Sequence, residues 1–133
     1  MRVALAQINP VVGDLNFNTK KIIDATRECV KQDVSLLVTP ELSLTGYPPE
    51  DLMLRKEFLS EVEHKLQTLA AAVGKEAPNL TIVIGHPCFK AQENLLYNSA
   101  SVFKGCKFIG RYSKLELPNY EVCDERRYFA SDG

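Results

Sequence analysis

The sequence lacks three features: an excess of charge of either sign, a long hydrophobic run, and closely spaced cysteines. Its 133 residues include 16 basic and 17 acidic side chains, which gives a net charge of −1. This balance provides no electrostatic footprint for nucleic acid, so we expect no nucleic-acid partner. No apolar run reaches the roughly 18 residues that a transmembrane helix needs, so we expect no membrane partner either.

The cysteines are few and scattered along the chain. There are four of them, with no C-x-x-C pair: Cys29, Cys88, Cys106 and Cys123. This spacing argues against a zinc site or a redox dithiol, so we expect no metal. Unpaired cysteines are typical of a reducing compartment, and the cytoplasm is the expected location.

The composition is that of one modest globular domain, with 45% hydrophobic and 25% charged residues. Apolar runs predict three buried strands, at residues 2–8, 34–39 and 80–85. Two further segments, 96–103 and 107–114, flank a glycine-containing turn at Lys104-Gly105-Cys106. This pattern predicts a β-hairpin.

Two segments have helical periodicity. Apolar side chains recur on one face between Thr19 and Gln32, and Asn18 fits as the N-cap. A second predicted helix runs from Glu50 to Lys75, with Gly74 as its stop signal. The resulting order, β-α-β-α-β-β-β, predicts an α/β fold that begins with crossovers and continues as an antiparallel meander. The segment after Leu115 has no period and predicts a loop with at most one turn of helix.

An acidic and a basic side chain lie where two predicted strands end. Glu41 follows the strand at 34–39, and Lys114 closes the strand at 107–114. An acid and a base held together at the edge of a sheet tune each other's pKa values, as acid–base catalysis requires. The spacing leaves two alternatives open. The residues form such a pair, or Glu41 only opens a loop and any contact is an ordinary surface salt bridge.

Longer stretches around these two residues resemble a known family. The segments "LLVTPELSLTGYPPEDL" and "RYSKLELPNYEVCDERRYF" resemble signature segments of the nitrilase (carbon–nitrogen hydrolase) superfamily, and "VALAQINPVVGDLNFNTKKI" resembles its first strand and helix. More narrowly, they are similar to the amino-terminal glutaminase domains of glutamine-dependent NAD+ synthetases. The resemblance implies a nitrilase-like αββα sandwich, of which residues 1–133 supply only the amino-terminal half, with the synthetase domain absent.

The resemblance also implies a Glu-Lys-Cys site that hydrolyses the side-chain amide of glutamine. In such a site Glu41 is the general base, and Lys114 stabilises the oxyanion of the tetrahedral intermediate. Tyr120 matches a position that lines the glutamine pocket, and Tyr47 is the candidate for a second wall. Cys123 stands where the family usually has phenylalanine, so that pocket wall is expected to be altered.

The nucleophilic cysteine of the family lies on a further strand, beyond the end of this chain. Cys29 is expected in the core, on the inner stripe of a helix. Cys106 is expected in the hairpin turn, facing solvent. Cys88, after a strand, is the least unsuitable substitute, but the family has no nucleophile at that position. We therefore expect the chain alone to be inactive.

For partners, the resemblance implies glutamine as the small-molecule substrate and a homo-oligomer as the assembly. It implies no cofactor for this domain, whereas the full-length enzyme would use ATP and Mg to amidate deamido-NAD. Two alternatives remain open. One is a free-standing carbon–nitrogen hydrolase of small amides, and the other is a truncated module that acts only by association.

Overall fold

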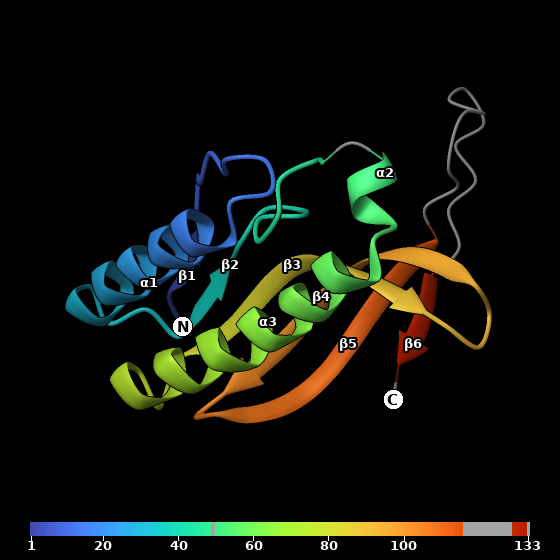
Figure 1. Ribbon diagram of the computed structural model, residues 1–133. Helices are drawn as coiled ribbons and strands as arrows, with labels where there is room; N and C mark the ends of the chain where they lie inside the picture. Colours follow the sequence, from blue (N-terminus) through green and yellow to red (C-terminus); the bar gives the residue numbers. More distant parts are fainter. Residues whose placement is uncertain (49, 116–128, 133) are drawn as a thin grey trace.

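The computed structural model describes residues 1–48, 50–115 and 129–132. Helices and strands alternate in its first half, and strands follow one another in its second half (Figure 1). The elements are β1 (Val3–Leu5), α1 (Leu15–Lys31), β2 (Leu36–Val38), α2 (Glu50–Met53), α3 (Lys56–Glu76), β3 (Thr81–Lys90), β4 (Leu95–Lys104), β5 (Lys107–Leu115) and β6 (Phe129–Asp132).

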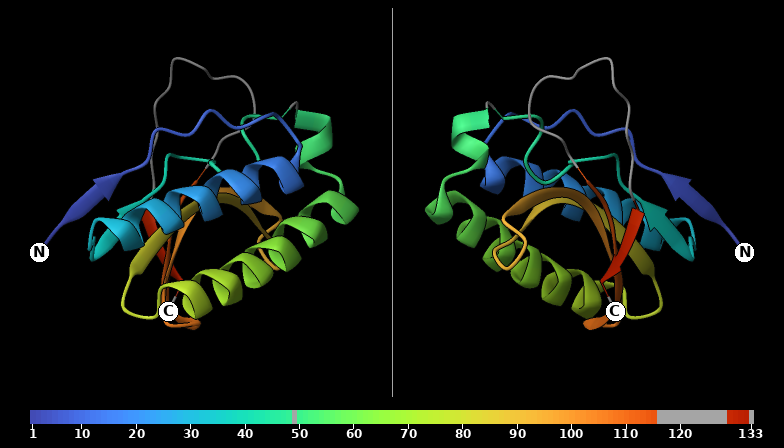
Figure 2. Two further views of the ribbon diagram at one scale, coloured as in Figure 1. Left: turned by 90° about the vertical axis from the view of Figure 1, so that its left-hand side faces the viewer. Right: turned by 90° about the vertical axis from the view of Figure 1, so that its right-hand side faces the viewer.

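The described strands form one sheet of six, in the order β1-β2-β3-β4-β5-β6. The first three strands are parallel, and each later strand is antiparallel to its predecessor. Parallel neighbours need crossover connections, which α1 supplies between β1 and β2, and α2 with α3 between β2 and β3. Both crossover connections have the same handedness, and both lead to the next strand in the same direction along the sheet. Their helices therefore lie on one side, and α1 and α3 cover the same face (Figure 2).

The core lies between this pair of helices and the sheet. Its side chains are apolar and almost fully buried, and they include Ile22, Cys29, Leu37, Val62, Leu66, Leu69, Ile82 and Ile84. The helical stripes and apolar strands predicted from the sequence meet here, and the prediction that Cys29 belongs to the core is confirmed. The described residues thus form one helical layer on one β-layer, which is half of an αββα sandwich.

The start of α1 differs from the prediction. Asp14 is the N-cap, because its carboxylate accepts a hydrogen bond from the backbone N–H of Phe17. Asn18, the predicted N-cap, is instead a fully buried residue within the first turn. Its amide nitrogen donates to the carbonyls of Val11 (2.8 Å) and Leu44 (3.0 Å), which ties the loops after β1 and β2 together. The helical period alone could not distinguish these two uses of an asparagine.

The second predicted helix is two helices, since the chain leaves helical geometry after Met53 and α3 begins at Lys56. Gly74 was wrongly predicted as a stop, because it lies inside α3. A Cβ at Gly74 would come within 2.2 Å of the backbone nitrogen of Cys106. Glycine is therefore needed at Gly74 for close contact between the helix and the hairpin turn, and not for ending the helix.

The strands differ from prediction mainly in length. The hairpin of β4 and β5 is confirmed, with Gly105 and Cys106 at positive φ in its turn. β3 continues to Lys90, past the apolar run that predicted it, because β4 pairs with it along its whole length. The predicted loop after Leu115 is wrong at residues 129–132, which pair with β5 as β6. Backbone pairing of this kind has no hydrophobic period and leaves little signal in a sequence.

The face of the sheet opposite α1 and α3 is not covered by the described residues. Strand alternation places Val3, Leu5 and Tyr112 on this face, and they are 52%, 74% and 56% exposed. The Glu41 loop crosses part of the same face.

Candidate active site

The loop after β2 is fixed to β3 by a short hydrogen-bond network. The Thr39 hydroxyl donates to the carbonyl of Val83 (2.9 Å) and accepts from the backbone N–H of Gly85 (3.2 Å). The Ser43 hydroxyl donates to Thr39 Oγ1 (2.8 Å), and the Leu44 N–H donates to the carbonyl of Gly85 (3.1 Å). Buried polar groups bonded in this way hold the loop in one arrangement.

Gly85 provides the space that this loop occupies. A Cβ at Gly85 would lie 2.4 Å from the carbonyl oxygen of Pro40 and 2.8 Å from the backbone nitrogen of Leu42. The loop therefore rests directly on the backbone of β3, on the sheet face away from the helices. Glu41, between Pro40 and Leu42, is carried by this contact over the sheet towards β4 and β5.

Strand pairing places Lys114 beside Glu41. Lys114 lies opposite Asn98 on β4, so both side chains leave the sheet on the face that the Glu41 loop crosses. Lys114 Nζ is 2.6 Å from Glu41 Oε2, although 73 positions separate the two residues in sequence. The lysine side chain is only 12% exposed, against 47% for the glutamate. The cation is therefore the more buried member of the pair.

Glu41 has a second donor. The Tyr47 hydroxyl donates to Glu41 Oε1 at 2.9 Å. Partial burial acts to raise the pKa of Glu41, but hydrogen bonds from Lys114 and Tyr47, the charge of Lys114 and a contribution from Asn98 outweigh it. The pKa of Glu41 is thus held below its ordinary value, and the group is an ionised carboxylate at neutral pH, ready to accept a proton.

Of the residues predicted from the sequence, the structure brings three together: Glu41, Lys114 and Tyr47. Tyr47 was predicted as a pocket wall, and it is 62% exposed while it bonds the carboxylate. Tyr120 and Cys123 lie outside the described residues. No sequence pattern singles out Asn98, because its place beside Lys114 follows only from the strand register.

None of the described cysteines is placed to attack a substrate at Glu41. Cys29 is buried in the core, and the Cys106 thiol donates to the carbonyl of Ala71 on α3. Cys88 lies opposite Tyr97 in the sheet, one position from the Asn98 pair, so it points to the helical face. There it accepts a hydrogen bond from Arg111 (3.3 Å).

Two further features are absent from the part of the chain that the structure describes. No group of three or more His, Cys, Asp or Glu side chains there could hold a metal ion. Within the same residues, no helix has the length and apolar character needed to cross a membrane.

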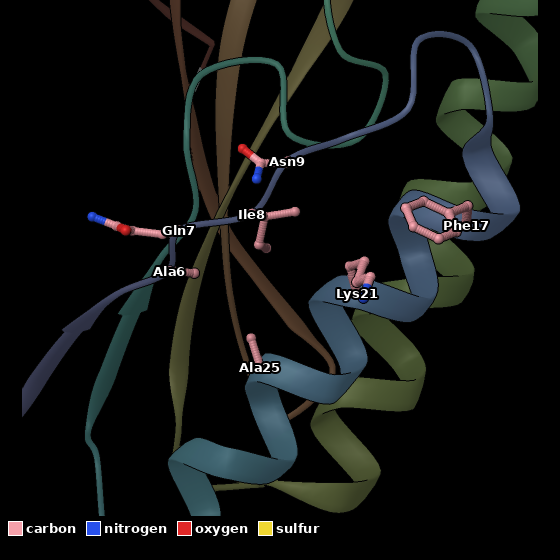
Figure 3. A pocket seen from close by; sticks show the side chains of 7 residues that line it. All are labelled: Ala6, Gln7, Ile8, Asn9, Phe17, Lys21 and Ala25. Carbon is pink, nitrogen blue, oxygen red and sulfur yellow. The ribbon is translucent and has the colours of Figure 1, made fainter.

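A hollow of about 460 Å³ lies between α1 and the segment after β1 (Figure 3). Its lining includes neither Glu41 nor Lys114 and consists of Ala6, Gln7, Ile8, Asn9, Phe17, Lys21 and Ala25. The Lys21 ammonium lies 5.3 Å from the centre of the Phe17 ring. The hollow holds no acid–base pair, and we assign it no catalytic role.

The chain belongs to the carbon–nitrogen hydrolase family, whose model matches residues 2–132. Within that class, its relatives include glutamine-dependent NAD+ synthetases. The enzyme of Thermotoga maritima is 46% identical over 129 residues, and that of Acinetobacter baylyi is 38% identical over 129 residues. Each alignment covers 97% of this chain, but only 22% and 23% of the relative. The chain therefore spans less than a quarter of the length of these relatives.

Solved structures of other proteins share the fold of this chain. The glutamine-dependent NAD+ synthetase of Acinetobacter baumannii superposes with a TM-score of 0.72 at 38% identity, covering 89% of this chain and 21% of that one. An amidase from Nesterenkonia superposes with a TM-score of 0.71 at 26% identity, covering 91% of this chain and 45% of that one. The half-sandwich is thus common to both kinds of enzyme, and the fold alone does not choose between them.

Proposed function

We propose that this chain supplies the general base and the oxyanion-stabilising cation of the glutaminase site in a glutamine-dependent NAD+ synthetase. The observation that carries the proposal is the 2.6 Å contact between Lys114 and Glu41 on the open face of the sheet. Relatives that are 46% and 38% identical over 97% of this chain support the choice of substrate.

In the proposed reaction, Glu41 takes the proton from a cysteine thiol supplied by a segment outside this chain. The thiolate attacks the side-chain amide carbon of glutamine, and Lys114 stabilises the negative charge that develops on the amide oxygen. Glu41 returns the proton to the amide nitrogen, which leaves as ammonia as the glutamyl thioester forms. Glu41 then accepts a proton from water, which attacks the thioester and releases glutamate and the thiol.

The remaining parts of the proposal concern the whole protein. Its synthetase domain would use ATP and Mg²⁺ to join the ammonia to deamido-NAD, whereas the glutaminase domain, to which residues 1–133 belong, would need no cofactor. The described cysteines Cys29, Cys88 and Cys106 form no disulfide with one another, which favours the cytoplasm. The open sheet face favours a homo-oligomer.

A free-standing hydrolase of small amides is the second candidate, and the likeness to the Nesterenkonia amidase favours it. The two candidates differ in what becomes of the ammonia, which the synthetase consumes and the amidase releases. A requirement for ATP and deamido-NAD in the full-length protein decides between them.

The central test is Glu41→Gln in the full-length protein. Loss of the general base should lower glutamine-dependent NAD+ formation by about 10² to 10⁴, while formation from added ammonia stays at the wild-type rate. Lys114→Met should give the same split through lost oxyanion stabilisation. A matched control is Glu76→Gln, which removes the Arg27 ion pair (2.9 Å) at an exposed site and should spare both activities. Equal loss with both nitrogen sources would show that Glu41 is structural.

A further inference from the structure

Among the described residues, the buried side-chain nitrogen of Asn98 in β4 meets no acceptor at ordinary hydrogen-bond geometry. The residue is 7% exposed, and its Nδ2 has no hydrogen-bond partner within the described part of the chain. A buried N–H without an acceptor costs free energy, so such groups call for an explanation. The hydroxyl of the neighbouring buried residue Ser99 is hydrogen-bonded to the hydroxyl of Ser113 at 2.9 Å. Asn98 therefore differs from the adjacent buried polar residue of the same strand.

The position of Asn98 connects it to the site. It pairs with Lys114 across β4 and β5 and with Pro87 across β3 and β4. The Glu41 loop rests two positions away from Pro87, on Gly85. Asn98 therefore lies on the face that carries the site, next to the strand on which the loop rests. Its side chain is near enough to Glu41 to be among the groups that lower the pKa of that carboxylate.

We propose that Asn98 is a positioning residue for Glu41, whose carboxylate accepts a hydrogen bond from its side-chain amide during the reaction. The inference rests on the proposed glutaminase function. In the resting arrangement Lys114 and Tyr47 occupy one carboxylate oxygen each. When the substrate binds, the lysine must also stabilise the oxyanion, and the carboxylate then needs another donor to keep its orientation.

A neutral amide suits this position for an electrostatic reason. Lys114 and Glu41 cancel each other's charge, and a second cation would have to be buried without a counter-charge. A carboxylate at the same place would repel Glu41 and raise its pKa. Asparagine donates a hydrogen bond and leaves the charge of the pair unchanged.

The test compares Asn98→Ala and Asn98→Asp with the control Ser99→Ala in the full-length protein. Ser99 is adjacent, equally buried and paired away from the site, so its change reports local disturbance of β4. We expect Asn98→Asp to shift the acid limb of the pH profile of kcat/KM for glutamine to higher pH, by roughly one unit. Asn98→Ala should lower kcat several-fold, with ammonia-dependent activity unchanged. Ser99→Ala should change neither quantity.

A double variant tests whether Asn98 acts through Glu41. In a Glu41→Gln background, Asn98→Ala should cause no further loss, because the carboxylate that it positions is already gone. A further loss would mean that Asn98 contacts the substrate itself and would overturn the proposal. An unshifted acid limb in Asn98→Asp, or an equal effect of Ser99→Ala, would overturn it as well.

A measurement without turnover separates this inference from the proposed function. With ¹³C-labelled glutamate, the carboxyl signal of Glu41 is identified by its loss in Glu41→Gln, and its pKa is read by titration. The pKa of Glu41 should be higher in Asn98→Asp and Asn98→Ala than in the wild type. If the wild type hydrolyses no glutamine, the function fails, and this titration still decides the role of Asn98.

Discussion

At the scale of single residues, the site depends on one carboxylate and the donors around it. Lys114 and Tyr47 bond the two oxygens of Glu41, and together with Asn98 they overcome the effect of its partial burial. Because the tyrosine is exposed and the lysine is not, the two donors are not equivalent. The lysine is held by the sheet, whereas the tyrosine belongs to the loop that also carries Glu41.

The lowered pKa of Glu41 predicts a pH dependence of stability. The folded-state pKa lies below the value of about 4.3 expected in the unfolded chain. The pair therefore contributes its full stability above the unfolded value, and loses it as the pH falls through the folded value. The difference in unfolding free energy between wild type and Glu41→Gln should be largest near neutral pH and shrink on acidification. Urea unfolding across this range measures it, and a constant difference would contradict the assigned ion pair.

At the scale of elements, the site exists because a loop rests on a strand. Thr39, Ser43 and Leu44 fix the loop by hydrogen bonds, and Gly85 lets its backbone approach β3. Lys114 arrives from the antiparallel half of the sheet, so the site spans the junction between the parallel and antiparallel strands.

This arrangement predicts that Gly85→Ala damages the site. The new methyl group would overlap the Pro40 carbonyl, which is backbone and cannot turn away. Overpacking of this kind costs about 1 to 3 kcal/mol, and displacing Glu41 by about 1 Å should lower glutamine-dependent activity on the order of 10²-fold. Unfolding midpoints and the ratio of glutamine- to ammonia-dependent rates measure the two effects.

The matched control is Gly110→Ala in β5, where an added Cβ meets nothing within 4 Å. It should leave both quantities near the wild-type values. If Gly85→Ala behaves like Gly110→Ala, the loop does not depend on contact with β3.

At the scale of the whole molecule, the described residues bring together a carboxylate and a cation, and none of the described cysteines lies beside them. We expect the purified 133-residue chain to release no ammonia from glutamine above background, because its described cysteines lie in the core, in the hairpin turn or on the helical face. An ammonia assay tests this. Turnover that an alkylating agent abolishes would show that a cysteine of this chain serves as the nucleophile.

The open face of the sheet predicts self-association of the same chain. Val3, Leu5 and Tyr112 are more than half exposed there, and β1 and β6 are at the two edges of the sheet. Exposed apolar surface and unpaired strand edges favour association. We expect a dimer or larger species by light scattering at micromolar concentration. A monodisperse monomer would contradict this expectation.

The sequence was most informative where hydrophobic period and turn chemistry act locally. The stripe of α1, the strand at 36–38 and the hairpin around Gly105 all correspond to predicted elements. The predictions were wrong where a residue has a distant partner. Asn18 bonds two loops, and Gly74 makes room for Cys106. Such roles depend on contacts that no local pattern contains.

By itself, then, the sequence determined the alternation of helices and strands, the balance of charge and the two residues worth testing, because these depend on composition, periodicity and local sequence motifs. The tertiary structure decided which side chains meet. The register of β4 and β5 places Asn98 beside Lys114, and the missing side chain of Gly85 lets the loop lie on β3. A contact of 2.6 Å across 73 residues then follows, because strand pairing and close backbone packing fix positions that sequence distance leaves free.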